Sequence, residues 1–151
     1  MSPLRALARP LLAAMFVAGG ADALRDPGGR VAAVRAAGLP QPERLVQVNA
    51  VVHLVGGLAL ATGRVPRLAA LALAGSLVPT TVVGHPFWSV PADQRQGQQI
   101  HFLKNLSMLG GLLLAAADPG GRESLPHAVG RVGRRAARQA ERRAGAVLSL
   151  G

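Results

Sequence analysis

Long apolar stretches separated by short polar segments dominate the chain. Four of them stand out, and each is about 18 residues long, which is near the minimum for a helix that spans the hydrocarbon core of a bilayer. They cover residues 7–24, 45–62, 68–85 and 100–117. The pattern therefore predicts an all-α protein built as a four-helix transmembrane bundle.

The second and third stretches are the clearest of the four. Residues 45–62 and 68–92 contain no formally charged side chain, and residues 63–67 form a short turn between them. In the outer stretches, Arg9 and Lys104 lie near the ends, where a long side chain can reach the membrane interface.

Pro and Gly mark the ends of the first and last stretches. The sequence Asp-Pro-Gly-Gly-Arg occurs at residues 26–30 and again at residues 118–122. Such residues end helices, and their repetition raises the hypothesis of an internal repeat. We expect a membrane domain at residues 1–120, with a short helix in its first loop, and a basic cytoplasmic tail at residues 121–151.

The distribution of basic residues predicts the orientation in the membrane. With four spans, both termini lie on one face, which carries 11 Arg residues against six basic residues on the other. Because basic residues stay on the cytoplasmic side of short loops, we expect an integral plasma (inner) membrane protein with both termini in the cytoplasm.

The N-terminal stretch has a second interpretation. Arg5 and Arg9 precede an apolar run, and residues 21–23 resemble a small-x-small cleavage site. A cleaved signal peptide would leave three spans. Gly19-Gly20 and Asp22 instead favour a packed helix with a polar position.

Composition narrows the chemistry. The formal charge is +10, but the apolar stretches argue against nucleic acid as a partner. The absence of Cys excludes disulfides, thiolate metal sites and Cys nucleophiles. The sequence also lacks a phosphate loop, a dinucleotide fingerprint and a metalloprotease helix.

Polar residues within the spans are the candidates for function. Because the spans alternate in direction, most of these residues fall in the half of the bundle opposite the termini, with His53 nearest the middle. Ionisable groups at membrane depth are costly, so they favour a polar pocket, although hydrogen bonds between helices or snorkelling would also explain them. We further expect Asp22 and Lys104 to pair. The pocket candidates are Asp22, Asn49, His53, His101, Lys104 and Asn105.

Residues after the third span suggest an interfacial anchor. His85, Phe87 and Trp88 lie where aromatic side chains are enriched at the membrane surface. A role for Trp88 in stacking on a quinone is a further hypothesis. No two His residues have the i, i+3 or i, i+4 spacing of a helical metal site, so we expect neither metal nor haem.

The C-terminal tail is rich in Arg on one side of a helical wheel. It predicts a weakly amphipathic basic helix that binds anionic inner-leaflet lipids, and a solvated disordered tail or a nucleic-acid-binding tail are the alternatives. The lipid-binding candidates are Arg131, Arg134, Arg135, Arg138 and Arg142.

Several motifs in order resemble the DoxX family of four-helix membrane proteins. They are Arg-Pro-Leu-Leu at 9–12, Gly-Gly-Ala-Asp-Ala-Leu at 19–24, Gly-Leu-Pro at 38–40, Gly-Gly-Leu-Ala-Leu-Ala-Thr-Gly at 56–63 and Lys-Asn-Leu-Ser-Met-Leu-Gly-Gly-Leu at 104–112. The resemblance covers about residues 5–120.

The resemblance implies a membrane subunit that supports thiol, sulfur or quinone-linked redox chemistry. Since Cys is absent, we expect a non-catalytic subunit, with quinone or another small hydrophobic molecule as ligand and an oxidoreductase as partner. A second copy of the chain is another partner to consider. The alternative functions are a small-molecule transporter and a membrane scaffold that docks partners through its basic tail.

Overall fold

The computed structural model describes residues 3–118, which form five α-helices. Four are long and a short one follows the first, as the sequence predicts. Their bounds are α1 (Pro3–Arg25), α2 (Gly28–Ala36), α3 (Pro42–Ala61), α4 (Pro66–Gly84) and α5 (Ala92–Ala117). The predicted tail helix and its arginines lie outside the described residues.

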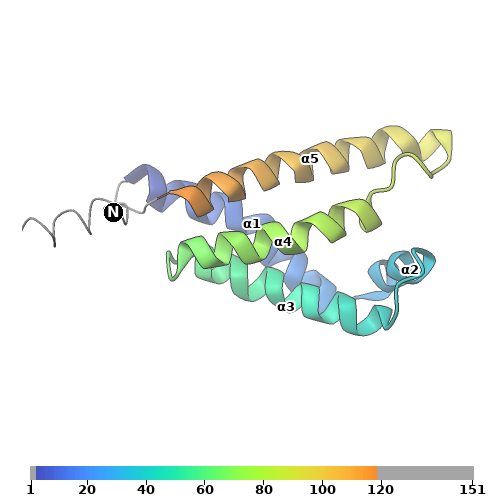
Figure 1. Cartoon of the computed structure of the whole chain (residues 1–151), viewed down its shortest axis with the longest axis horizontal. Coiled ribbons are helices and arrows are strands. Elements are labelled where there is room, and N and C mark those ends of the chain that lie inside the picture. Colours follow the sequence, from blue (N-terminus) through green and yellow to red (C-terminus); the bar gives the residue numbers. More distant parts are fainter. Residues whose placement is uncertain (1–2, 119–151) are drawn as a thin grey trace, which may run out of the picture. The chain divides into compact units, whose positions relative to one another are not determined.

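The four long helices lie side by side (Figure 1). α1 packs mainly on α3, α3 also packs on α4, and α4 packs on α5. α1 and α5 contact each other much less. Short α2 packs against α3 and α4 at the end of the bundle where α1 finishes.

Local sequence explains where the helices begin and end. α1 ends at Arg25 and α5 ends at Ala117, each immediately before an Asp-Pro-Gly-Gly-Arg segment, as predicted. α3 and α4 each begin with a proline, whose missing N–H costs nothing in the first helical turn. The turn between them uses Gly63, whose φ of 71° suits glycine. α5 begins at Ala92 rather than at residue 100, because helix continues through a polar segment beyond the apolar stretch.

The interior is divided between apolar and polar halves. The apolar core lies mostly in the half that contains the N-terminal end of α1, and the largest fully buried side chains there are Phe16, Leu60, Leu73 and Leu112. The buried polar residues are His53 near the middle of α3, Thr81 late in α4 and Asn105 near the middle of α5. Polar groups therefore enter the interior from the middle of the bundle towards its opposite end.

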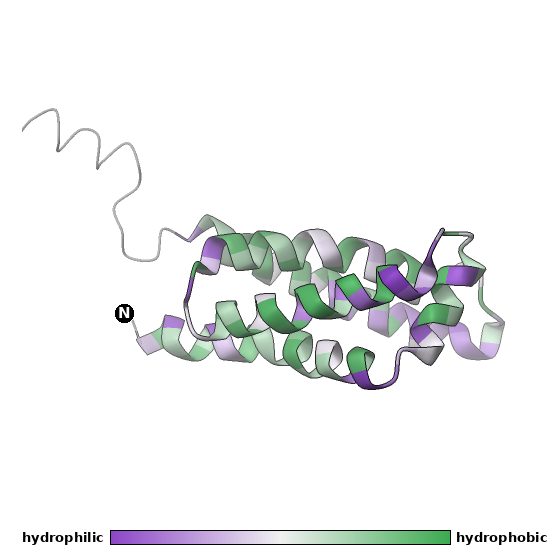
Figure 2. Ribbon diagram, turned by 90° about the horizontal axis from the view of Figure 1, so that it is seen from below, coloured by the Kyte–Doolittle hydropathy of each residue, from purple (hydrophilic) through white to green (hydrophobic). Residues whose placement is uncertain are grey.

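The outward surface of the long helices is apolar. Figure 2 shows hydrophobic residues along these helices and hydrophilic residues concentrated towards their ends and loops. Side chains such as Leu11, Val55 and Leu114 are more than half exposed. Within residues 3–118, the four helices α1, α3, α4 and α5 are long and apolar enough to cross a membrane. Exposed apolar side chains on such helices are expected where lipid is the solvent.

Candidate functional site

A half-open cavity of about 100 Å³ lies between α4 and α5. Its walls come from one face of each helix, at i, i+3 and i+4 spacings that bring side chains together. The residues that line it are Val78, Thr81, Val82, Phe102, Asn105, Leu106 and Leu109. Val78, Val82 and Leu106 are each about half exposed, so the cavity borders the surface that faces lipid.

Asn105 supplies the free polar group of this cavity. Its residue is 6% exposed, and its amide makes no hydrogen bond with another residue in the described part of the chain. Thr81 is also buried there, but its hydroxyl donates to the Leu77 carbonyl at 2.7 Å. Among residues 3–118 the fully buried side-chain atom without a partner is His53 Nε2, so the Asn105 amide keeps some surface that is accessible from the cavity. The cavity therefore combines apolar walls with one side chain that can both donate and accept a hydrogen bond.

An aromatic cluster continues from the cavity wall. The ring of Phe102 lies edge-on to Phe87 and Trp88, with centroid separations of 5.3 and 5.9 Å. Phe87 and Trp88 also contact each other edge-on. Phe87 and Trp88, two of the three residues that the sequence proposes as interface anchors, thus pack on Phe102, which lines the cavity. Their role as membrane anchors stays a prediction.

His85 and His101 meet beside this cluster. Their rings stack at 5.1 Å, and His85 Nδ1 lies 2.8 Å from Gln98 Oε1, a distance that suits donation by a protonated Nδ1. Burial lowers the pKa of His85, which follows the last residue of α4. Positive charge on His101 and Lys104 lowers this pKa further, and the Gln98 hydrogen bond partly offsets the effect.

Two other candidates on α3 point to different helices. Asn49 donates to Thr80 Oγ1 on α4 at 3.0 Å. This matches the interpretation that its side chain forms a hydrogen bond between helices. His53 instead packs edge-on against Phe16 of α1, with centroids 5.2 Å apart. Its Nε2 is buried and has no partner among the residues that the structure describes.

Asp22 lies elsewhere. It is exposed, and its carboxylate pairs with Arg30 of α2 at 2.8 Å. Within residues 3–118 it forms no ion pair with Lys104, contrary to the expected pairing. The reason is that α1, which carries Asp22, and α5, which carries Lys104, have few contacts. Arg30 of α2, the helix that follows α1, forms the ion pair instead.

The six predicted residues therefore separate into distinct groups. Of them, Asn105 lines the cavity, and Lys104 contributes positive charge near His85. The other four make the contacts just described. Sequence reasoning missed Phe102 as a wall residue and Arg30 as a partner. The spacing of Phe102 three residues before Asn105, on the same helix face, is a signal that could have found it. Residues 3–118 hold no group of three or more His, Asp or Glu side chains suited to a metal ion.

Comparison with known proteins agrees with this architecture. The model of the DoxX family matches residues 4–86, more than half of the chain. The chain is 27% identical over 115 residues to the inner membrane protein YphA of Escherichia coli strain K12, which covers 76% of this chain and 82% of YphA. No solved structure matches the chain significantly. The family match and the four long apolar helices of residues 3–118 show that this chain is an integral membrane protein and belongs to the DoxX family.

Proposed function

We propose that this protein is a non-catalytic subunit of the inner membrane that binds a small, lipid-soluble carbonyl compound, such as a quinone, in the cavity between α4 and α5. The unpaired Asn105 amide inside an apolar cavity is the observation that carries the proposal. The cavity is smaller than the roughly 300–1,000 Å³ of typical ligand pockets. It therefore suits a single ring whose tail extends into lipid.

The chemistry of an amide fits both redox states of a quinone. An Asn side chain can donate to a carbonyl oxygen of the oxidised ring and accept from a hydroxyl of the reduced ring. Phe102 supplies an aromatic wall next to this amide. A quinone would bring electron-carrying capacity, while the protein's own residues bind and orient its ring.

The wider role rests on family resemblance. The DoxX resemblance implies support of thiol, sulfur or quinone-linked redox complexes, and YphA is an inner membrane protein. Because the chain has no Cys, an oxidoreductase partner would exchange the electrons. Quinone bound to the purified protein favours this function over a transporter or a scaffold.

Trp88 offers a direct measurement of binding. It is the single Trp of the chain, and its ring contacts Phe102, which lines the cavity. We expect decylubiquinone to quench Trp88 fluorescence saturably in the detergent-purified full chain. Asn105→Leu removes the amide at similar volume, and losing a buried hydrogen bond of about 1–3 kcal/mol should weaken binding roughly 5- to 150-fold.

Asn49→Leu is the matched control, because Asn49 bonds to Thr80 and does not line the cavity. This variant should keep the affinity of the unaltered protein. Non-saturating quenching, or equal quenching in all three proteins, would show that the quinone only collides with Trp88 from the micelle and would refute the site.

A further inference from the structure

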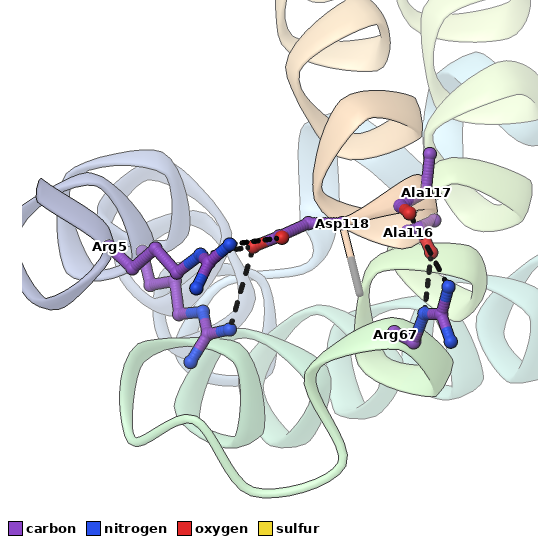
Figure 3. A network of polar contacts seen from close by, with 6 residues as sticks. Arg5, Arg67, Ala116, Ala117 and Asp118 are labelled. Atoms are coloured by element: carbon purple, nitrogen blue, oxygen red, sulfur yellow. Dashed lines mark hydrogen bonds and ion pairs between the residues drawn. The ribbon is translucent and has the colours of Figure 1, made fainter. Parts of the chain in front are cut away.

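Three arginines gather around the C-terminal end of α5. Arg5 of α1 binds the Asp118 carboxylate through two nitrogens: Nε lies 2.9 Å from Oδ2, and Nη2 lies 2.9 Å from Oδ1. Arg67 of α4 donates from Nε and Nη2 to the carbonyls of Ala116 and Ala117, at 3.1 and 3.3 Å. Figure 3 shows these two guanidinium groups on either side of the last turn of α5. Both are held by acceptors of the protein.

Arg9 is the exception. Its Nη2 forms only a long ion pair with Asp118 Oδ2, at 3.9 Å and beyond hydrogen-bond distance, whereas Arg5 bonds to both carboxylate oxygens. The Arg9 side chain is nevertheless only 11% exposed. A guanidinium carries five N–H donors, and those of Arg9 make no hydrogen bond within residues 3–118. A nearly buried cation with free donors favours binding of an anion.

The charge around Arg9 strengthens this inference. At this end of the bundle the described residues include four arginines, namely Arg5, Arg9, Arg64 and Arg67, and the one carboxylate of Asp118. The ends of membrane-spanning helices lie at the level of lipid headgroups. Phosphate is the anion present there, and its oxygens match the planar fork of a guanidinium.

Apolar surface next to this cluster favours a lipid over free phosphate. Leu114 lies one helical turn before Asp118 on the same face of α5, and it is 76% exposed. Leu12, three residues after Arg9, lies at the seam between α1 and α5, where its side chain approaches Gly111. A phospholipid could thus place its phosphate at Arg9 and its acyl chain along this seam.

We propose that Arg9, with Arg5 beside it, forms a binding site for the phosphate of an anionic phospholipid at the junction of α1 and α5. This site is separate from the cavity between α4 and α5 and does not depend on the proposed quinone function. It also differs from the predicted lipid-binding tail, because it is made by the folded bundle.

Native mass spectrometry of the full chain in mixed micelles containing dioleoyl-phosphatidylglycerol tests the site. Arg9→Gln should weaken retention of this lipid at least fivefold. Arg64→Gln is the matched control, because it removes the same charge from the same end, and Arg64 is exposed. It should weaken retention less than twofold. The unaltered tail contributes equally to all proteins compared.

Other outcomes overturn the proposal. Equal losses in the two variants would indicate diffuse attraction, and no loss in Arg9→Gln would remove the site. If inorganic phosphate displaces the lipid at millimolar concentration through Arg9, the ligand is free phosphate. If Arg9→Gln does not fold, Arg9→Lys serves as the second variant, because it keeps the positive charge but lacks the planar, two-pronged guanidinium. We expect it to retain the lipid at least threefold more weakly. Retention equal to that of the unaltered protein would contradict the proposal.

Discussion

His85 is expected to make the stability of the bundle sensitive to acid. Burial lowers the pKa of His85 in the folded protein below its usual value of about 6.5, so the unfolded state binds more protons as the pH falls through this range. The stabilising contribution is therefore present above pH 6.5 and declines below it. The melting temperature in detergent should fall between about pH 7 and pH 5.

His85→Gln isolates this contribution. Gln keeps a polar side chain beside Gln98 but does not titrate, so the variant should lose less stability over the same pH interval than the unaltered protein. Parallel melting curves against pH would show that other groups cause the acid sensitivity.

For single residues, the sequence identified the polar side chains inside the spans more easily than the residues with which they pair. The depth of Asp22 and Lys104 suggested a pair, whereas Asp22 binds Arg30, eight residues further along the chain. Depth fixes only one coordinate of a residue in a bundle, and the packing of neighbouring helices determines the other two. Arg30 was within reach because α2 folds back beside the end of α1.

Close approach of α1 and α3 depends on particular glycines. A Cβ at Gly20 would lie 2.7 Å from Leu54 N and 2.8 Å from Ala50 O, both backbone atoms of α3, whereas a Cβ at Gly19 would meet nothing within 4 Å. Gly20→Ala should therefore separate the helices and lower the melting temperature. Gly19→Ala should be neutral or slightly stabilising, since Ala favours a helix by about 1 kcal/mol over Gly.

Both substitutions add the same methyl group and the same helix propensity, so their difference measures the helix contact. Thermal unfolding in detergent provides the comparison. Equal melting temperatures for the two variants would mean that α1 and α3 do not approach as closely as the structure has them.

The helices themselves were largely readable from the sequence. Long uncharged stretches gave the four spans, and the repeated Asp-Pro-Gly-Gly-Arg segments gave the ends of α1 and α5. Small residues let helices pack closely, and Gly57 of α3 lies against Val17 of α1. The start of α5 was missed, because apolar periodicity marks the membrane-facing part of a helix and not its polar extension.

For the whole molecule, the order of helix contacts was the part that sequence could not supply. Four antiparallel helices can pack next to one another in several different orders. Because all four have apolar outer surfaces, hydrophobicity does not indicate which surfaces face lipid and which face another helix. The structure places α4 between α3 and α5 and leaves few contacts between α1 and α5, among them Leu12 against Gly111. Arg5 of α1 also binds Asp118, just after the end of α5. This arrangement creates the cavity around Asn105, which the sequence alone placed in a broader polar pocket.

The orientation of the bundle in the membrane is the remaining prediction. Four spans return the end of α5 to the face where α1 begins, and that face and the tail together carry 11 arginines against six basic residues opposite. Because basic segments resist translocation, both termini should be cytoplasmic. In Escherichia coli, a C-terminal green fluorescent protein fusion should fluoresce, and a C-terminal alkaline phosphatase fusion should be inactive. Phosphatase fused after Gly38, in the first loop, should be active and serves as the control. An active C-terminal phosphatase with a dark fluorescent fusion would reverse the orientation.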